Sequence, residues 1–90
     1  MEERLTEAQL TEKLTTAAAQ VMVGSLYQHY KGGIYKVLDL AVLESTNEVC
    51  VLYQAQYGKQ LKFIRTVDVW LETVEYNGAT VPRFARYNKA

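Results

Sequence analysis

The chain opens with apolar residues at steps of three and four positions, the pattern of an amphipathic helix. Residues 5–23 contain no glycine or proline and are rich in good helix formers. Thr6 followed by Gln9 has the spacing of a capping box. The apolar positions form one narrow stripe, made of Leu10, Leu14, Ala17, Ala18 and Val21. We therefore predict an N-terminal helix within residues 1–23, whose stripe packs either on the chain's own sheet or on a second copy.

From Gly24 onward the pattern changes to short runs of β-branched and aromatic residues, with turn residues about every ten positions. This pattern is typical of a small all-β unit, and we expect five or six strands. The first four are predicted near residues 26–30, 34–44, 48–57 and 61–65, followed by a turn at residues 66–68. In the third strand the alternation predicts an inward face made of Val49, Val51, Tyr53, Ala55 and Tyr57.

A hairpin near the C-terminus is the best-specified element. Asn77-Gly78 supplies the two positive φ angles that a type I′ turn needs. Counting back from this loop pairs residue 76 with 79, 75 with 80, 74 with 81, 73 with 82, and 72 with 83. Pro82 then has its missing N–H away from its partner, so this last strand is predicted to be an edge.

Together these elements predict a mainly β fold with one N-terminal α-helix. Short, twisted strands with one long second strand that must bend favour a small SH3-like antiparallel barrel. The alternative is a curled, open sheet with the helix laid across it. In either case residues 1–23 form the helix, residues 24–90 form a β-barrel-like domain, and the whole is expected to be a single structural domain.

Composition excludes several classes of protein. Ten Lys and Arg residues balance ten Asp and Glu residues, so no global field draws the chain to nucleic acid or to an anionic membrane. The balance is uneven, because the segment before Gly24 has four acids and two bases, which leaves six acids and eight bases after it. Cys50 is the only cysteine, so an internal disulfide is impossible. Without a secretory signal or a long apolar run, we expect a soluble, cytoplasmic protein that does not enter a membrane.

Residues that could carry catalysis or bind a metal are sparse. His29 is the only histidine, and one His with one Cys shows no ligand spacing. Cys50 lies in an apolar strand, where most thiols are inert. The Lys31-Gly32-Gly33 segment lacks the strand-to-helix context of a phosphate loop and is expected to be a hairpin turn. We therefore expect no catalytic residue, no metal and no cofactor.

Aromatic and cationic residues are interleaved along the β region. The chain has seven tyrosines and one tryptophan. The interleaved residues are Tyr27, Tyr30, Tyr35, Tyr53 and Tyr57 with Lys31, Lys36, Lys59, Lys62 and Arg65. Aromatic faces beside cations stack on unpaired bases and also hold peptides. Tyrosine is equally a favoured strand residue that packs its ring in a core, so both interpretations stay open.

Several of these residues resemble the signature of a small bacterial family, the domain of unknown function 1653. The segment His29-Tyr30-Lys31-Gly32-Gly33-Ile34-Tyr35 matches its His-Tyr-Lys-Gly-x-x-Tyr core. The likeness continues through Tyr57-Gly58, Arg65 and Val81-Pro82-Arg83-Phe84, and covers residues 24–84. Phe63, Thr66 and Val69-Trp70 depart from the residues usual in the family. The resemblance implies a compact bacterial domain and names no activity or substrate.

The residues favour a non-catalytic binding module that recognises a peptide, a nucleic acid or a small anionic ligand. The predicted site is Tyr27, His29, Lys31, Tyr35, Tyr57 and Arg65. The alternative is a structural protein that forms homo-oligomers through its N-terminal helix. A small enzyme that uses His29 is the third hypothesis, and it lacks a visible base, nucleophile and orienting group. The partner, protein or nucleic acid, is left unidentified by the sequence.

Overall fold

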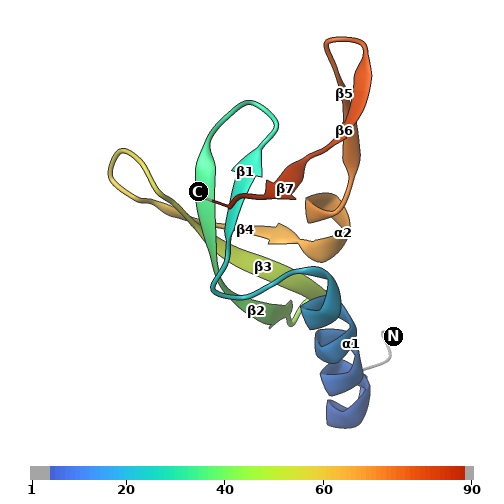
Figure 1. Ribbon diagram of the computed structural model, residues 1–90. Helices are drawn as coiled ribbons and strands as arrows, with labels where there is room; N and C mark the ends of the chain where they lie inside the picture. The colour runs from blue at the N-terminus through green and yellow to red at the C-terminus, as the bar shows by residue number, and fades with distance from the viewer. Residues whose placement is uncertain (1–4, 89–90) are drawn as a thin grey trace.

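The structure, a computed structural model, describes residues 5–88. Its elements follow one another along the chain as shown in Figure 1: α1 (Glu7–Gln20), β1 (Leu26–His29), β2 (Ile34–Leu43), β3 (Glu48–Ala55), β4 (Lys62–Thr66), α2 (Val67–Trp70), β5 (Thr73–Tyr76), β6 (Ala79–Pro82) and β7 (Phe84–Arg86). The fold is thus mainly β with one long N-terminal helix, as the sequence predicts. The helix and the β5–β6 hairpin extend from opposite ends of the central sheet.

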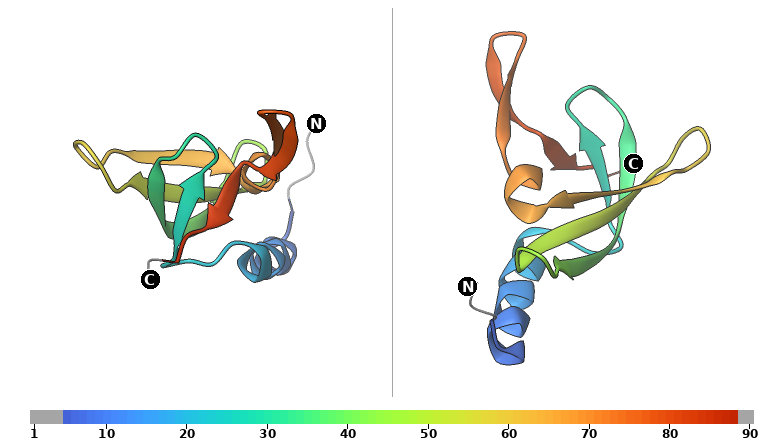
Figure 2. Two further views of the ribbon diagram at one scale, coloured as in Figure 1. Left: turned by 45° about the horizontal axis from the view of Figure 1, so that its top comes forward. Right: turned by 180° about the vertical axis from the view of Figure 1, so that it is seen from behind.

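The central sheet has five antiparallel strands in the order β4-β3-β2-β1-β7. Strands β4 and β7 are its two edges within the described residues, so the sheet does not close into a barrel. Of the two predicted forms, the open, curled sheet is therefore the one found. The register of β2 with β3 shifts between Val37 and Asp39, and such a bulge bends a strand and increases its twist. Figure 2 shows the result, because β1 and β7 run steeply across the direction of β3 and β4.

The hairpin register predicted from Asn77-Gly78 is confirmed. The φ angles of these two residues are 53° and 81°, and the pairs run from residues 76 and 79 to residues 73 and 82. The pairing continues one step further, because Arg83 N donates to Glu72 O at 2.9 Å. Strand β6 pairs only with β5 within residues 5–88, as expected of an edge. The short strand β7, which pairs with β1, was not predicted.

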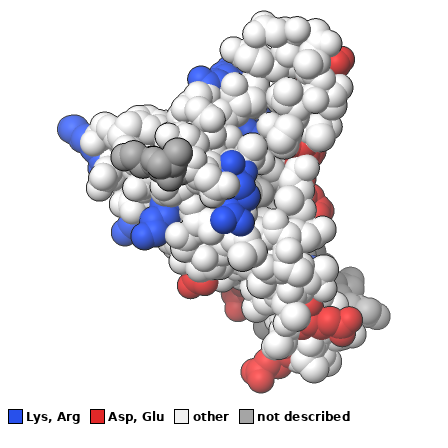
Figure 3. All heavy atoms as spheres, in the orientation of Figure 1, with Lys and Arg blue, Asp and Glu red and all other residues white. Residues whose placement is uncertain are grey.

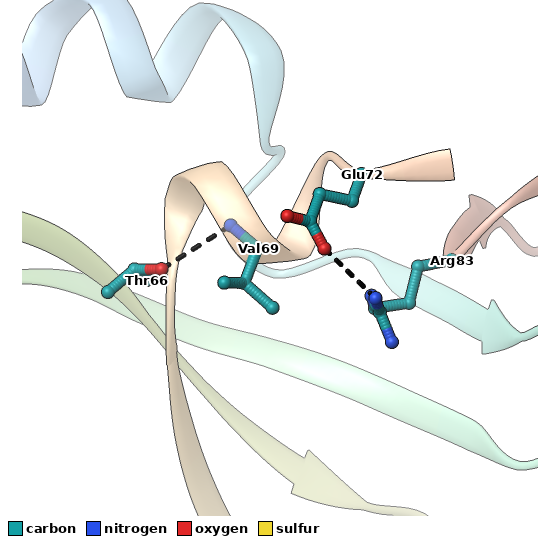
Figure 4. A network of polar contacts seen from close by, with 4 residues as sticks. All are labelled: Thr66, Val69, Glu72 and Arg83. Atoms are coloured by element: carbon teal, nitrogen blue, oxygen red, sulfur yellow. Dashed lines mark hydrogen bonds and ion pairs between the residues drawn. The ribbon is translucent and has the colours of Figure 1, made fainter. Parts of the chain in front are cut away.

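The predicted turn at residues 66–68 is instead the start of a one-turn helix, α2. The Thr66 hydroxyl accepts a hydrogen bond from Val69 N at 3.3 Å and caps this helix, as Figure 4 shows. The turn places the Trp70 side chain in the core with only 1% of its surface exposed. A local cap therefore determines where the largest core side chain lies.

Helix α1 packs on the chain's own sheet, which was one of the two predicted arrangements. Its capping box between Thr6 and Gln9 is present. Ala17 and Val21 are buried in the core, and Leu14 packs against it. None of the helices in the described part of the chain is long and apolar enough to span a membrane.

Of the five residues predicted on the inward face of the third strand, four are buried, namely Val49, Val51, Tyr53 and Ala55, and Cys50, which the alternation placed on the other face, is buried as well. The fifth, Tyr57, is wrong as an inward residue, because its side chain is 51% exposed. Strand β3 ends at Ala55, and Gly58 has a positive φ of 59° in the turn that follows. The chain has therefore left the sheet before it reaches Tyr57.

Candidate functional site

One buried ring, that of Phe84 on β7, lies where five elements meet. Trp70 of α2 stacks on it with the ring centroids 3.7 Å apart and an interplanar angle of 5°. His29 of β1, Tyr35 of β2 and Tyr53 of β3 approach it edge-on, at centroid distances of 5.1, 6.0 and 5.7 Å. The edge-to-face contacts are a favoured arrangement of aromatic rings. We call these five residues the Phe84 cluster.

A cation from β4 lies over this cluster. The guanidinium carbon of Arg65 is 5.6 Å from the centroid of the Phe84 ring, within cation–π range. Arg65 Nε donates to the hydroxyl of Tyr53 at 2.7 Å, which fixes the orientation of the side chain. Within residues 5–88 Arg65 has no acidic partner, since the ion pair there joins Arg83 to Glu72. The positive charge of Arg65 is thus held in place without being neutralised.

The surroundings of the His29 imidazole lower its pKa. Partial burial lowers its pKa below the usual 6.5, and the charges of Arg65, Arg83 and Lys31 lower it further. Its Nδ1 accepts a hydrogen bond from Lys31 N at 3.2 Å, so the neutral ring carries its proton on Nε2. At neutral pH His29 is therefore an uncharged donor in a positive surrounding.

Two tyrosine hydroxyls form a polar rim next to the cluster. The hydroxyls of Tyr35 and Tyr57 are hydrogen-bonded to each other, and the ring centroids are 5.6 Å apart. This hydrogen bond is the main cause, and burial the second, of a pKa of Tyr35 that is raised to about 12. A Cβ on Gly33 would lie 3.2 Å from a ring carbon of each tyrosine, so any other residue at this position of the β1–β2 turn would require the two rings to shift. Tyr35 therefore stays uncharged over the whole physiological pH range.

Arg83 anchors the β5–β6 hairpin beside the cluster. Its Nη2 lies 3.0 Å from Glu72 Oε1, and Figure 4 shows the two side chains meeting just beyond α2. Its Nε is buried and has no hydrogen-bond partner within the described residues. The side chain thus adds charge next to His29 while its position is set by Glu72.

The structure brings four of the six predicted site residues together: His29, Tyr35, Tyr57 and Arg65. Tyr27 lies in the core with 5% exposure, packs edge-on against Trp70 at 5.4 Å, and accepts a hydrogen bond from Met22 N at 2.9 Å. Lys31 lies in the exposed β1–β2 turn, with its Nζ 5.8 Å from the ring centroid of Tyr30. Tyr27 is therefore not part of the surface that the other four form, and Lys31 contacts it through its backbone N–H, which donates to His29 Nδ1, while its side chain lies over Tyr30.

Sequence reasoning did not identify Phe84, which organises the cluster, or Tyr53 as the partner of Arg65. Phe84 comes directly after Arg83, the last residue of the predicted hairpin pairing. The sequence therefore indicates that Phe84 leaves the hairpin, but it does not indicate which residues its ring contacts. Only the return of the chain as β7 beside β1, with Phe84 opposite His29, creates the cluster.

Other reactive groups are unremarkable. Cys50 is a buried free thiol. Burial, and to a smaller extent the negative charge of Glu48, raises the pKa of this thiol, which disfavours the reactive thiolate. Among residues 5–88 no three His, Cys, Asp or Glu side chains gather as a metal site would require.

Charge is segregated on the surface. Figure 3, in the orientation of Figure 1, shows basic side chains over the centre and left of this face, and acidic side chains around α1, at the lower edge of the sheet and along the right-hand edge up to the β5–β6 hairpin. On this face the basic side chains therefore cluster over the sheet, whereas the acidic ones lie mainly at its periphery and on the helix.

Comparisons with known proteins add a family and a structural relative. The model of the family described as "Protein of unknown function (DUF1653)" matches residues 25–86. A crystal structure of a protein belonging to DUF1653 from Bordetella bronchiseptica is 34% identical, with a TM-score of 0.68 over 79% of this chain and 94% of that one. The comparison with curated proteins gives no match. The resemblance noted in the sequence is thereby confirmed.

Proposed function

The chain belongs to the DUF1653 family of proteins of unknown function, and we propose that it is a non-catalytic module that binds an anionic ligand. The proposed surface consists of His29, Tyr35, Tyr57 and Arg65. The observation that carries this proposal is the guanidinium of Arg65, which lies over Phe84 without an acidic partner in residues 5–88.

Arg65 is suited to bind an anion because its side chain is already ordered. The bond from its Nε to the Tyr53 hydroxyl and the contact with Phe84 reduce the conformational freedom that binding would otherwise remove. The terminal nitrogens make no hydrogen bond within the described residues, and their planar fork matches a carboxylate or a phosphate. The half-exposed ring of Tyr57, paired with Tyr35, provides an apolar and hydrogen-bonding edge of the same surface.

The ligand classes that fit are a peptide, a segment of nucleic acid and a small anion. All of them carry carboxylate or phosphate groups or approach aromatic rings. Because the net charge of the chain is zero, attraction must come from the local surface rather than from a global field. Binding should accordingly weaken when salt is raised above about 0.1 M.

A titration with three probes tests the proposal: inorganic pyrophosphate, a single-stranded oligonucleotide and an acidic peptide. Trp70 fluorescence can report binding because Trp70 stacks on Phe84 beneath Arg65. We expect at least one probe to bind to the wild type and to lose about tenfold in affinity in Arg65→Gln. Lys36→Gln is the matched control, since it removes one exposed cation from the face opposite Tyr35. Equal affinities of the two variants for every probe would refute the proposal.

Assembly through α1 is the second proposal, and it has less support. Ala17 and Val21 of its apolar stripe already pack in the chain's own core. A shallow groove of about 520 Å³ between α1 and α2, lined mostly by polar side chains, is what remains for a partner. Sedimentation that shows a monomer would set this proposal aside.

The buried, free Cys50 fits a reducing compartment, and we include a cytoplasmic location in the proposal.

A further inference from the structure

The edge strand β4 exposes more apolar surface than an edge normally does. It is the outermost strand of the sheet on one side and pairs only with β3 within residues 5–88. Leu61, Phe63 and Ile64 are 60%, 40% and 59% exposed. Soluble proteins usually protect such edges, because the unpaired backbone groups are a template for another strand.

The pairing of β4 with β3 fixes which backbone groups are free. Ala55 N donates to Leu61 O at 3.0 Å, so in this antiparallel ladder every second residue from Leu61 bonds to β3. The residues between them, Lys62 and Ile64, direct their N–H and C=O groups away from β3. Neither has a backbone partner on that side in the described part of the chain.

The charge of this edge has a single sign. Residues 57–66 contain Lys59, Lys62 and Arg65 and no carboxylate. Each face of β4 carries one cation and one apolar side chain, because Phe63 and Arg65 share the face of Tyr53 while Lys62 and Ile64 share the other. A strand that pairs with this edge would therefore meet a cation, two apolar residues and a second cation in succession.

We propose that β4 binds an extended acidic peptide segment by strand addition. The segment would carry the pattern acidic, apolar, apolar, acidic, with its acids facing Lys62 and Arg65 and its apolar residues facing Phe63 and Ile64. Main-chain hydrogen bonds to Lys62 and Ile64 supply the attachment, and the alternating side chains supply the specificity. This inference rests on the proposed function and identifies its ligand, since Arg65 belongs to both surfaces.

Charge distinguishes the peptide from the other occupants of an open edge. A second copy of β4 would bring its own Lys62 and Arg65, and no carboxylate, to the same contact. A nucleic acid has no backbone that continues a β-sheet, and it would leave the exposed Ile64 without an apolar partner. An acidic strand satisfies the free backbone groups, the two cations and the two apolar side chains together.

The test uses a capped peptide with the core Glu-Val-Val-Glu between threonines, titrated into the 15N-labelled chain. We expect the largest amide shift changes and new hydrogen-exchange protection at Lys62 and Ile64. Ile64→Pro removes an outward N–H without breaking the ladder to β3, and should lower affinity about tenfold. Ile64→Thr, which keeps the N–H, should bind more tightly than Ile64→Pro. A peptide with lysines in place of the glutamates should not bind measurably.

A second measurement keeps the protein wild type, in case Ile64→Pro does not fold. Two further peptides are N-methylated on the first or on the second valine. In an added strand alternate N–H groups face β4, so one methyl group should abolish binding and the other should be tolerated.

The outcomes separate this inference from the proposed function. If both N-methylated peptides bind like the parent, or if Ile64→Pro binds the parent peptide like the wild type, strand addition is refuted. The proposed function still stands in that case if Arg65→Gln weakens binding of the peptide or of pyrophosphate. If Arg65→Gln weakens binding of none of the three probes, the oligonucleotide included, both proposals fail.

Discussion

Replacing Phe84 by leucine should destabilise the protein well beyond the change in side-chain size. Leucine keeps an apolar side chain of similar volume in this buried position, a swap that by itself costs under about 1.5 kcal/mol. The substitution also removes the ring that stacks on Trp70 at 3.7 Å, and aromatic pairs contribute about 0.5–1.5 kcal/mol beyond their buried area. The edge-on contacts with His29, Tyr35 and Tyr53 are lost as well. We expect a total loss of about 2 kcal/mol in unfolding free energy.

Phe63→Leu is the matched control for this measurement. Phe63 is also an aromatic residue of the sheet, but it is 40% exposed and meets Tyr35 and Tyr53 at centroid distances of 6.4 and 5.8 Å. Its replacement should cost less than about 0.7 kcal/mol, because two fifths of its surface already faces water and leucine keeps an apolar side chain in the part that is covered.

Urea unfolding of the two variants and the wild type provides the comparison. A domain of this size has about 5–13 kcal/mol of stability, so Phe84→Leu should stay folded. With a slope of about 2 kcal/mol/M, its midpoint should fall by about 1 M while the Phe63→Leu midpoint changes little. Equal midpoints for the two variants, with unchanged slopes, would show that Phe84 is not the centre of the aromatic packing.

Three further predictions follow from the site and the helix. Below pH 6.5 the unfolding free energy should fall as pH decreases towards the lowered pKa of His29, since the unfolded chain binds the proton first, and His29→Gln should flatten this part of a pH series of denaturant titrations. In Tyr57→Phe the pKa of Tyr35 should fall from about 12 towards 10, as followed by NMR of labelled tyrosine rings; an unchanged pKa would mean that the hydroxyl pair is not its cause. Ala17→Asp should cost at least about 3 kcal/mol by placing a charge in the core, whereas Ala18→Asp on the exposed side of α1 should cost about 1 kcal/mol in the same urea assay, from the lower helix propensity of aspartate and its charge near the C-terminal end of the helix.

Local chemistry made much of the fold predictable. The Asn77-Gly78 turn requires two positive φ angles, so it specifies the loop and, with it, every pair of the hairpin down to residues 73 and 82. The capping box of Thr6 and Gln9 marks the start of α1 in the same way. Such features depend on residues a few positions apart, and a sequence displays them directly.

Long-range placement could not be obtained in this way. The alternation in β3 gave Tyr53 its inward side correctly, but it gave no signal that the strand ends before Tyr57. In the sequence nothing distinguishes Tyr27 from the tyrosines predicted to be exposed, yet α2 brings Trp70 against the Tyr27 ring, which is buried as a result. The meeting of Arg65 with Phe84 depends on both edges of a five-stranded sheet curling towards each other, which no spacing along the chain encodes.

The pKa of the His29 imidazole, measured by NMR with and without saturating inorganic pyrophosphate, tests most directly whether this surface binds anions. The free protein should show a pKa below 6.5, because partial burial disfavours the charged ring and Arg65, Arg83 and Lys31 oppose a further positive charge. An anion bound at Arg65 offsets those charges, so the pKa should rise in its presence, and the rise should be lost in Arg65→Gln and kept in Lys36→Gln. A pKa that is the same with and without pyrophosphate in the wild type would contradict the account.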